Sequence, residues 1–314
     1  MIKKYYKYYF LFVLSLLFIT ACSTMFLPAD SKETKKESEI ENYRNGEFVN
    51  SNPIEGMNGS FFEIAYKFIF ENKNARTPNF EIPVETTNVK KFISDSLDVL
   101  STGCLGHAAN LINIDGTIIL TDPMLTKWAS PIAWIGPKRF FNSPIEIENL
   151  PIIDAVLISH NHYDHLDKES ILRLNAKTKK FIVPIGVDKN LLDWGISSEK
   201  IIVQNWWNEL KLNDNVKIIT TPAQHFSGRK FSNGQSTLWS SWIIQSKSEN
   251  IFFSGDSGYG SHFKEIGEKY GPFDFAMMEC GQYNEMWPDI HMFPEQSAQA
   301  ASGNTSIATG KATT

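Results

Sequence analysis

The chain has 314 residues, of which 42% are hydrophobic, so it is long enough to bury the core of a domain of roughly 200 residues. Its formal net charge is −5, and no long basic stripe runs through it. These features argue against a nucleic-acid-binding protein, which needs clustered Lys and Arg for phosphate contacts.

The N-terminus has the pattern of a secretory signal. Lysines within the first seven residues precede a short apolar run over residues 8–19, and small residues stand directly before Cys22. About twelve apolar residues are too few to span a bilayer, so we expect a signal peptide over residues 1–21 rather than an uncleaved anchor. The pattern resembles a bacterial lipobox, which implies lipid attachment to Cys22. We therefore expect a lipid-anchored protein of the bacterial cell envelope, at the outer membrane or the cell surface.

Two further segments precede the main domain. Residues 22–55 are rich in charges of both signs and poor in large apolar groups, so we expect a solvated, flexible tether. Residues 56–97 are predicted to form an N-terminal arm. It would open with a short amphipathic helix over residues 59–70 and continue as an extended segment through two prolines.

Residues 98–301 have the pattern of one compact α/β domain. We expect helices over residues 168–175 and 262–269, and strands over residues 98–105, 109–114, 117–120, 155–159, 179–183, 200–203, 216–220, 238–245, 250–254 and 275–279. This order predicts two layers of sheet covered by helices. Cys104 and Cys280 lack any metal-site spacing, and we expect both to be buried core residues.

The predicted strand at 155–159 runs directly into a dense set of potential metal ligands. His160, His162, Asp164 and His165 follow it in H-x-H-x-D-H order. Alternate residues leave an extended chain on the same side, so His160 and His162 can face one point. A polar surface loop would explain a lone histidine but not this spacing. Imidazole nitrogen and carboxylate oxygen are ligands for Zn²⁺ and similar ions, so the sequence predicts a metal site.

Two later strands also end beside potential ligands. His225 follows the strand at 216–220, and Asp256 follows the strand at 250–254. Gly255 and Gly258 flank Asp256 and allow the backbone to turn tightly there. A two-metal hydrolase needs more donors than the first cluster supplies, so we expect both residues to join it.

Together these residues resemble the metallo-β-lactamase superfamily. Longer phrases resemble its N-acylphosphatidylethanolamine-hydrolysing phospholipase D branch, in order from about residue 100 to about residue 300. These phrases are GHA (106–108), LTDPM (120–124), GPKR (136–139), ISHNHYDHLD (158–167), PAQHFSGR (222–229), LWSSW (238–242), GDSGY (255–259) and FKEIG (263–267).

The resemblance implies a four-layer αββα sandwich that holds two zinc ions at one edge of its sheets. The first ion would bind His160, His162 and His225. The second would bind Asp164 and His165, and Asp256 would bridge the two ions.

The C-terminal end departs from the family. The resemblance implies a further histidine ligand after the last helix, but no histidine follows His291, and residues 302–314 form a polar tail of small residues. We therefore expect a sandwich that is incomplete at its C-terminus, weaker binding of the second ion, and lower activity.

The resemblance also implies a zinc-dependent phosphodiester hydrolase of phospholipase D type, in which a metal-bridging hydroxide attacks phosphorus. The catalytic residues would be Asp256, Asp164 and His291. His291 stands where the family contacts the phosphate or the leaving group, although an exposed loop histidine is an equal alternative. We expect His107 and Asp122 to support the ligands rather than bind the ions.

The segment over residues 124–144 combines aromatic and basic side chains. Trp128 and Phe140 can contact lipid chains, and Lys138 and Arg139 can bind a lipid phosphate, so we expect a phospholipid or other phosphodiester as substrate. The alternative is that these rings only cover the sheet.

Two other functions stay open. One is a lactonase or another metallo-hydrolase of the same fold, because fold and ligands alone do not choose the substrate. The other is a non-catalytic surface lipoprotein with an impaired metal site. Metal content separates that lipoprotein from the enzymes, and substrate screening separates the enzymes from each other.

Overall fold

A computed structural model describes residues 40–54, 78–86, 88–94, 100–131, 136–229 and 235–302. The expected signal peptide with Cys22, the helix near residues 59–70 and the tail after residue 302 lie outside these ranges. Within them, no helix is both long enough and apolar enough to cross a bilayer.

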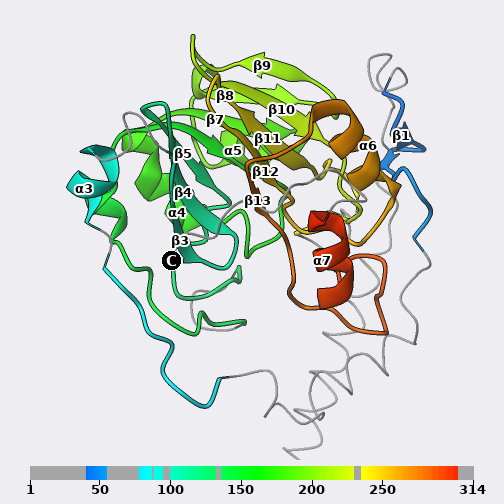
Figure 1. Cartoon of the computed structure of the whole chain (residues 1–314), viewed down its shortest axis with the longest axis horizontal. Helices are drawn as coiled ribbons and strands as arrows, with labels where there is room; N and C mark the ends of the chain where they lie inside the picture. The colour runs from blue at the N-terminus through cyan, green and yellow to red at the C-terminus, as the bar shows by residue number, and fades with distance from the viewer. Residues whose placement is uncertain are drawn as a thin grey trace, which may run out of the picture.

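Two β-sheets form the centre of the domain (Figure 1). The first has six strands in the order β3-β4-β5-β6-β7-β8, antiparallel from β3 to β5 and parallel from β5 to β8. Its strands are β3 (Ser101–Gly106), β4 (Ala109–Ile114), β5 (Thr117–Thr121), β6 (Ile153–Leu157), β7 (Thr178–Pro184) and β8 (Ile201–Gln204).

The second sheet has five strands in the order β13-β12-β11-β10-β9. Only β12 and β13 pair in parallel. Its strands are β9 (Glu209–Lys211), β10 (Lys217–Thr221), β11 (Ser241–Gln245), β12 (Asn250–Phe253) and β13 (Phe275–Met277). The helices are α3 (Val89–Ser94), α4 (Lys168–Leu174), α5 (Val187–Asp193), α6 (Ser261–Tyr270) and α7 (Pro294–Ala301).

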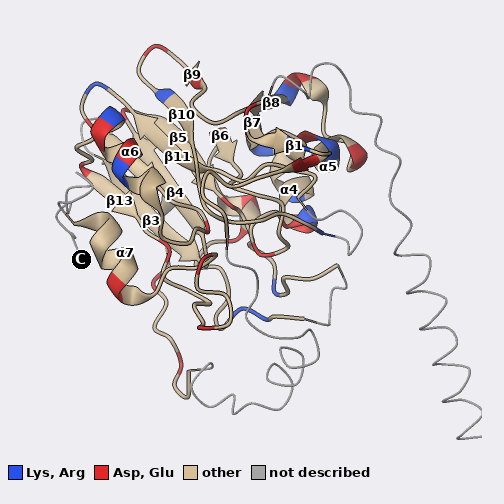
Figure 2. Ribbon diagram, turned by 90° about the vertical axis from the view of Figure 1, so that its right-hand side faces the viewer, with Lys and Arg blue, Asp and Glu red and all other residues tan. Residues whose placement is uncertain are grey.

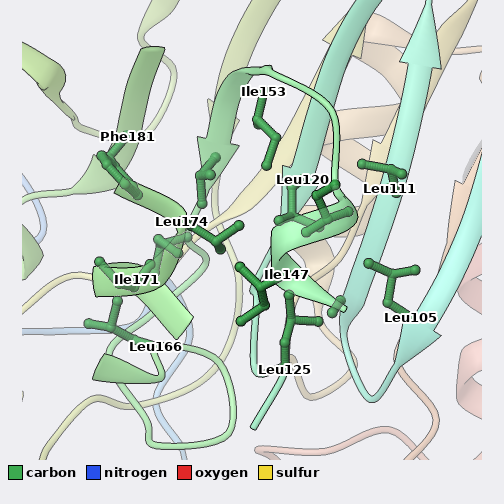
Figure 3. Close-up of a cluster of buried hydrophobic side chains, with 14 of the residues drawn as sticks. Leu105, Leu111, Leu120, Leu125, Ile147, Ile153, Leu166, Ile171, Leu174 and Phe181 are labelled. Carbon is green, nitrogen blue, oxygen red and sulfur yellow. The ribbon is translucent and has the colours of Figure 1, made fainter. Parts of the chain in front are cut away.

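Alternation of apolar side chains along the strands produces the layers. On β11, Trp242 and Ile244 point into the core between the sheets, whereas Ile243 packs on the outer side against α6 and α7. The outer face of the first sheet is covered by α4 and α5. Ile171 of α4, labelled in Figure 3, and Leu191 of α5 belong to one cluster of buried hydrophobic side chains with residues of this sheet. The four-layer αββα sandwich is therefore confirmed. Figure 2 shows the charged residues mainly on the helices and loops outside the two sheets.

Most predicted strands are present, with shifted ends. The predicted strand at 238–245 begins only at Ser241, because the backbone N–H groups of Leu238 and Ser240 donate to Ile185 and Ser159 in loops of the first sheet. Helices α3, α5 and α7 and the short strand β9 are not predicted from the sequence, and α3 lies where an extended segment was expected. All four are eight residues or fewer, and patterns this short do not show a period.

The predicted tether is wrong for residues 40–54. This segment forms a small hairpin of β1 (Tyr43–Arg44) and β2 (Glu47–Phe48) that packs on the domain. Phe48 is only 2% exposed and lies in a cluster with Trp206 and Trp239. One buried aromatic anchor holds a segment whose average composition is polar.

The prediction of buried cysteines is also wrong. Cys104 and Cys280 are both exposed. Cys104 lies on β3 and Cys280 follows β13, and these are the edge strands of the two sheets. An edge strand has no neighbour on one side to cover its side chains.

Candidate metal centre

The ligand residues come from the loops that follow β6, β10 and β12. Each of these strands ends at the same edge of the sandwich, and their loops carry His160 to His165, His225 and Asp256. The structure therefore brings together all six residues that the sequence reading assigned as metal ligands. Their donor atoms form overlapping groups within 4.8 Å of one another.

Three imidazoles converge at the first position. The Nε2 atom of His160 lies 2.8 Å from Nδ1 of His162, and Nε2 of His225 lies 3.3 Å from the same atom. Donors of one tetrahedral Zn²⁺ ion, bonded at 2.0–2.1 Å, lie about 3.4 Å apart. This spacing suits three nitrogens that share one cation.

The carboxylates Asp164 and Asp256 flank His165 at the second position. Nε2 of His165 lies 3.1 Å from Oδ2 of Asp256 and 3.9 Å from Oδ2 of Asp164. Asp256 Oδ2 is also 3.9 Å from Nε2 of His225. Asp256 therefore lies between the two groups of donors, as expected of a bridging ligand.

A buried network fixes the orientation of two ligands. Asp122 is fully buried and accepts hydrogen bonds from Nδ1 of His165 at 2.8 Å, from the Ser159 hydroxyl at 2.6 Å and from the Ser159 N–H at 2.7 Å. Since the Ser159 proton goes to Asp122, Nδ1 of His160 donates to the Ser159 oxygen at 2.9 Å. Both imidazoles then present the Nε2 lone pair to the site.

Both the ring and the backbone of His225 are held by hydrogen bonds. Its Nδ1 donates to the Ile290 carbonyl at 2.9 Å, which leaves Nε2 free to bind a metal. Its backbone N–H donates to the Asn50 side-chain oxygen, and its carbonyl accepts from the Asn50 amide, at 3.0 and 2.8 Å. The N-terminal hairpin thus supports a ligand loop of the site.

The protonation preferences divide the site into two parts. Burial lowers the pKa of His162 to about 4 and the pKa values of His160 and His225 well below the usual value. These imidazoles are neutral at pH 7, as metal binding requires. Burial also lowers the pKa of His165, but the adjacent carboxylates of Asp256 and Asp164 raise it well above the usual value. The second position therefore favours a positive charge, which a metal ion would supply.

A second carboxylate–histidine pair lies beside Asp256. Nδ1 of His291 donates to Oε1 of Glu279 at 2.7 Å, and Oε2 of Glu279 accepts the Met292 N–H at 2.9 Å. Although burial lowers the pKa of His291, its hydrogen bond with Glu279 raises it above the usual value. Of the two ring nitrogens of His291, Nε2 is the one that can contact a substrate or a metal ion.

A cavity of about 400 Å³ opens beside these groups. Its walls include His107, Asp256, Glu279 and His291, together with apolar side chains such as Met278. A substrate in this cavity would reach Asp256 and His291 at once.

The predicted substrate residues lie elsewhere. None of Trp128, Lys138, Arg139 and Phe140 is among the described residues that line this cavity. Trp128 and Arg139 line a separate hollow of about 730 Å³. The Arg139 guanidinium donates to the carbonyls of Leu105, Met124 and Phe141, whereas Phe140 is 60% exposed.

The sequence reading missed Glu279, Ser159 and Asn50. Glu279 had a detectable signal, because it is a carboxylate at the end of a predicted strand, as Asp256 is. Ser159 was assigned to the strand, and Asn50 to the tether. Nothing in the local sequence shows that either contacts a metal ligand.

The donor set fits a divalent metal ion. It combines imidazoles with carboxylates at spacings suitable for shared coordination. In His160, His165 and His225, a hydrogen bond at Nδ1 leaves Nε2 available for the metal.

A family model described as "Beta-lactamase superfamily domain" matches residues 117–305. The chain belongs to the metallo-β-lactamase superfamily. Relatives of this superfamily member include an uncharacterised Mycobacterium tuberculosis protein, 37% identical over 279 residues that cover 87% of this chain and 73% of the relative. The N-acyl-phosphatidylethanolamine-hydrolyzing phospholipase D 1 of Caenorhabditis elegans is 32% identical over 297 residues, which cover 88% and 83%. This match supports membership in the phospholipase D branch.

Two further matches are narrower. The outer membrane protein RomA of Klebsiella pneumoniae is 49% identical over 89 residues, which cover 28% of this chain and 67% of RomA. The solved structure of an isothiocyanate hydrolase from Delia radicum gut bacteria shares the fold, with a TM-score of 0.52, 18% identity and coverage of 64% of this chain and 79% of that one. The comparisons with metallo-hydrolases make this superfamily member a metal-dependent hydrolase.

Proposed function

We propose that this chain is a zinc-dependent phosphodiesterase of phospholipase D type that acts on an N-acylphosphatidylethanolamine-like phospholipid. The observation that carries the proposal is the placement of Asp256 between two groups of metal donors, with His291 and a cavity beside it. The name of the Caenorhabditis elegans relative supplies the substrate class.

When bound, two zinc ions would acidify a water molecule and neutralise charge that develops on the phosphate. The residues of this chain divide the remaining work. Asp256 keeps its carboxylate ionised, because the charge and hydrogen bond of His165 hold its pKa well below the usual value against the effect of burial. It accepts a hydrogen bond from the attacking water and orients that water toward phosphorus.

His291 is placed to assist the leaving group. One proton of the water passes to solvent as its oxygen bonds to phosphorus. The bond from phosphorus to the N-acylethanolamine oxygen breaks, Nε2 of His291 gives its proton to that oxygen, and His291 then regains a proton from solvent. The raised pKa of His291 keeps the proton available near neutral pH. Glu279 holds the ring in position through Nδ1.

The exposed loop around Phe140 suits contact with a lipid surface. Phe140 is 60% exposed, and Lys138 is also exposed. Because both lie outside the metal cavity, we propose that they bind the membrane rather than the scissile phosphate. Phe140→Ala and Lys138→Ala should each lower hydrolysis of vesicles severalfold and leave a soluble phosphodiester unaffected. Equal loss on both substrates would contradict this role.

The N-terminal pattern supports attachment to the cell envelope through a lipid on Cys22, and RomA is named as an outer membrane protein. Metabolic labelling with radioactive palmitate tests the anchor. Label should enter the full-length chain but not its Cys22→Ser variant. Label in both variants would refute lipid attachment at Cys22.

The decisive assay uses the full-length, zinc-loaded chain with vesicles of N-acylphosphatidylethanolamine. Release of N-acylethanolamine and phosphatidic acid is expected, with a loss of about a hundredfold in kcat for His291→Gln. Glu279→Gln should lower kcat less and leave KM and zinc content unchanged. Turnover of a lactone with none of the phospholipid would favour the lactonase. Zinc binding without any turnover would favour the non-catalytic lipoprotein. The number of zinc ions bound per chain also tests the expected weakness of the second site.

A further inference from the structure

His107 lies directly across the second metal position. Its Nε2 atom is 3.2 Å from Oδ2 of Asp164 and 3.3 Å from Nε2 of His165. These separations match the distance of about 3.4 Å between donors that share one tetrahedral zinc ion. His107, Asp164 and His165 thus form a group of three donors on one side of the site, and Asp256 adjoins it through His165.

The backbone at His107 lies in the left-handed region, which few non-glycine residues adopt. His107 follows the end of β3 in a two-residue turn to β4 and has a φ of 54°. Among non-glycine residues, Asn, Asp and His are the ones most often found at positive φ. This turn places the imidazole of His107 beside Asp164 and His165.

A neighbouring side chain braces the turn. The Arg139 guanidinium donates to the carbonyl of Leu105 and packs against Gly106, where any side chain would collide with it. Arg139 is itself fixed by the Met124 carbonyl. The hairpin tip is therefore held in place, which gives His107 a defined position relative to Asp164.

The other histidines have different partners. The sequence has seven. Three form the first position, and His165 belongs to the second. His262 is hydrogen-bonded to Ser257, and the free Nε2 of His291 belongs to a group with His225 and Asp256. Among the described residues, His107 is the histidine that groups with Asp164 and His165.

We infer that His107 is a direct ligand of the second metal ion and completes a four-donor set with Asp164, His165 and Asp256. This goes beyond the supporting role that the sequence reading gave it. It rests on the two-metal site proposed above.

Metal titration of the full-length chain tests the inference. His107→Asn removes the imidazole but keeps a residue that tolerates positive φ, so the turn should survive. Asp115→Asn is the matched control, because Asp115 has a φ of 48° at the other end of β4. We expect two zinc ions per wild-type and control chain. In His107→Asn the first ion should bind normally and the second at least about tenfold more weakly.

Two further measurements separate ligation from indirect support. In the cobalt-loaded protein, loss of a ligand should change the visible absorption of the second ion. In His107→Gly, added imidazole should restore binding of the second ion by occupying the vacated position, and it should not alter the control. Circular dichroism confirms that each variant is folded, and His107→Gly replaces His107→Asn if the latter fails to fold.

The outcomes are distinguishable from failure of the proposed function. Two ions bound to His107→Asn with wild-type affinity and an unchanged cobalt spectrum would overturn the inference while leaving the two-metal hydrolase intact. A wild-type chain that binds fewer than two ions at saturating zinc would overturn both.

Discussion

Asp122 connects the two halves of the metal centre at the level of single residues. It accepts three hydrogen bonds, and through Ser159 and His165 it orients one ligand of each position. Its side chain is fully buried, so these bonds are not replaced by water when they are lost. The burial of such a carboxylate is stabilising only while all of its partners are present.

Asp122→Asn should weaken metal binding by about 10–100-fold, because the neutral amide no longer fixes the His165 tautomer. The free energy of unfolding should fall by about 1–3 kcal/mol. Zinc titration and urea denaturation check the two effects. Asp154→Asn is a control at the start of β6, where Asp154 accepts from Ile118 and Lys179. Unchanged zinc affinity in Asp122→Asn would show that Asp122 does not tune the ligands.

At the level of elements, the hairpin of β1 and β2 braces the loop that follows β10. Asn50 forms two hydrogen bonds with the backbone of His225 and a third with the indole N–H of Trp239 at 2.9 Å. The hairpin itself is anchored by Phe48 and by the Phe48 N–H, which donates to the Gln235 carbonyl at 2.8 Å. A segment far from His225 in the sequence thus determines how rigidly His225 is held.

Asn50→Ala should lower the free energy of unfolding by about 2 kcal/mol, since it leaves buried polar groups without partners. It should also weaken the first metal ion, because the His225 loop loses its support. Asn52→Ala is the control, since Asn52 makes an exposed hydrogen bond to Ser261. Thermal denaturation with and without zinc measures both effects. Equal behaviour of the two variants would argue against a bracing role for Asn50.

Helix α6 carries a buried histidine that should make the protein acid-sensitive. Burial lowers the pKa of His262 from 6.5 to about 3. The unfolded chain therefore binds a proton between these pH values while the folded chain does not. Stability from this group is complete above pH 6.5 and is lost as the pH falls toward 3, by up to about 1.4 kcal/mol per pH unit.

His262→Gln keeps a hydrogen-bonding side chain opposite Ser257 but removes the titration. The slope of unfolding free energy against pH should become shallower between pH 6.5 and 4. Urea denaturation at several pH values measures it, and the other histidines contribute equally to both proteins. An unchanged slope would mean that His262 takes up its proton without unfolding.

At the scale of the whole molecule, the metal ions should hold the two sheets together at one edge. The proposed ligands come from loops of both sheets. A cation bound between them would attract the nitrogen and oxygen donors of both loops at once. A ligand present at about a hundred times its Kd stabilises the folded state by about 2.7 kcal/mol.

Removal of the metal with a chelator should therefore lower Tm by about 5–10 °C. Differential scanning calorimetry of the full-length chain checks this, and re-addition of zinc should restore Tm. The same chelator should have little effect on a His160→Ala, Asp256→Ala double variant. A Tm that is insensitive to chelation in the unmodified chain would mean that the ions contribute nothing to the fold.

Local sequence determined the layers of this protein and brought out the proposed ligand set. Alternating apolar residues define strands wherever a sheet is buried on one side, and the dense H-x-H-x-D-H run after such a strand specifies metal chemistry without reference to distant residues. His225 and Asp256 could be predicted for the same reason, since each follows a strand that ends at the same edge of the sandwich.

Only the tertiary structure decided what surrounds those ligands. Asn50 reaches His225 from a segment that was predicted to be a tether. Glu279 pairs with His291 because the segment between β13 and α7 folds back on itself. His107, for which we propose a coordinating role, lies near Asp164 for a similar reason, because the turn between β3 and β4 lies beside the loop after β6. Periodicity reports which face of an element is buried, but contacts between distant loops depend on how the two sheets pack, and that information is distributed over the whole chain.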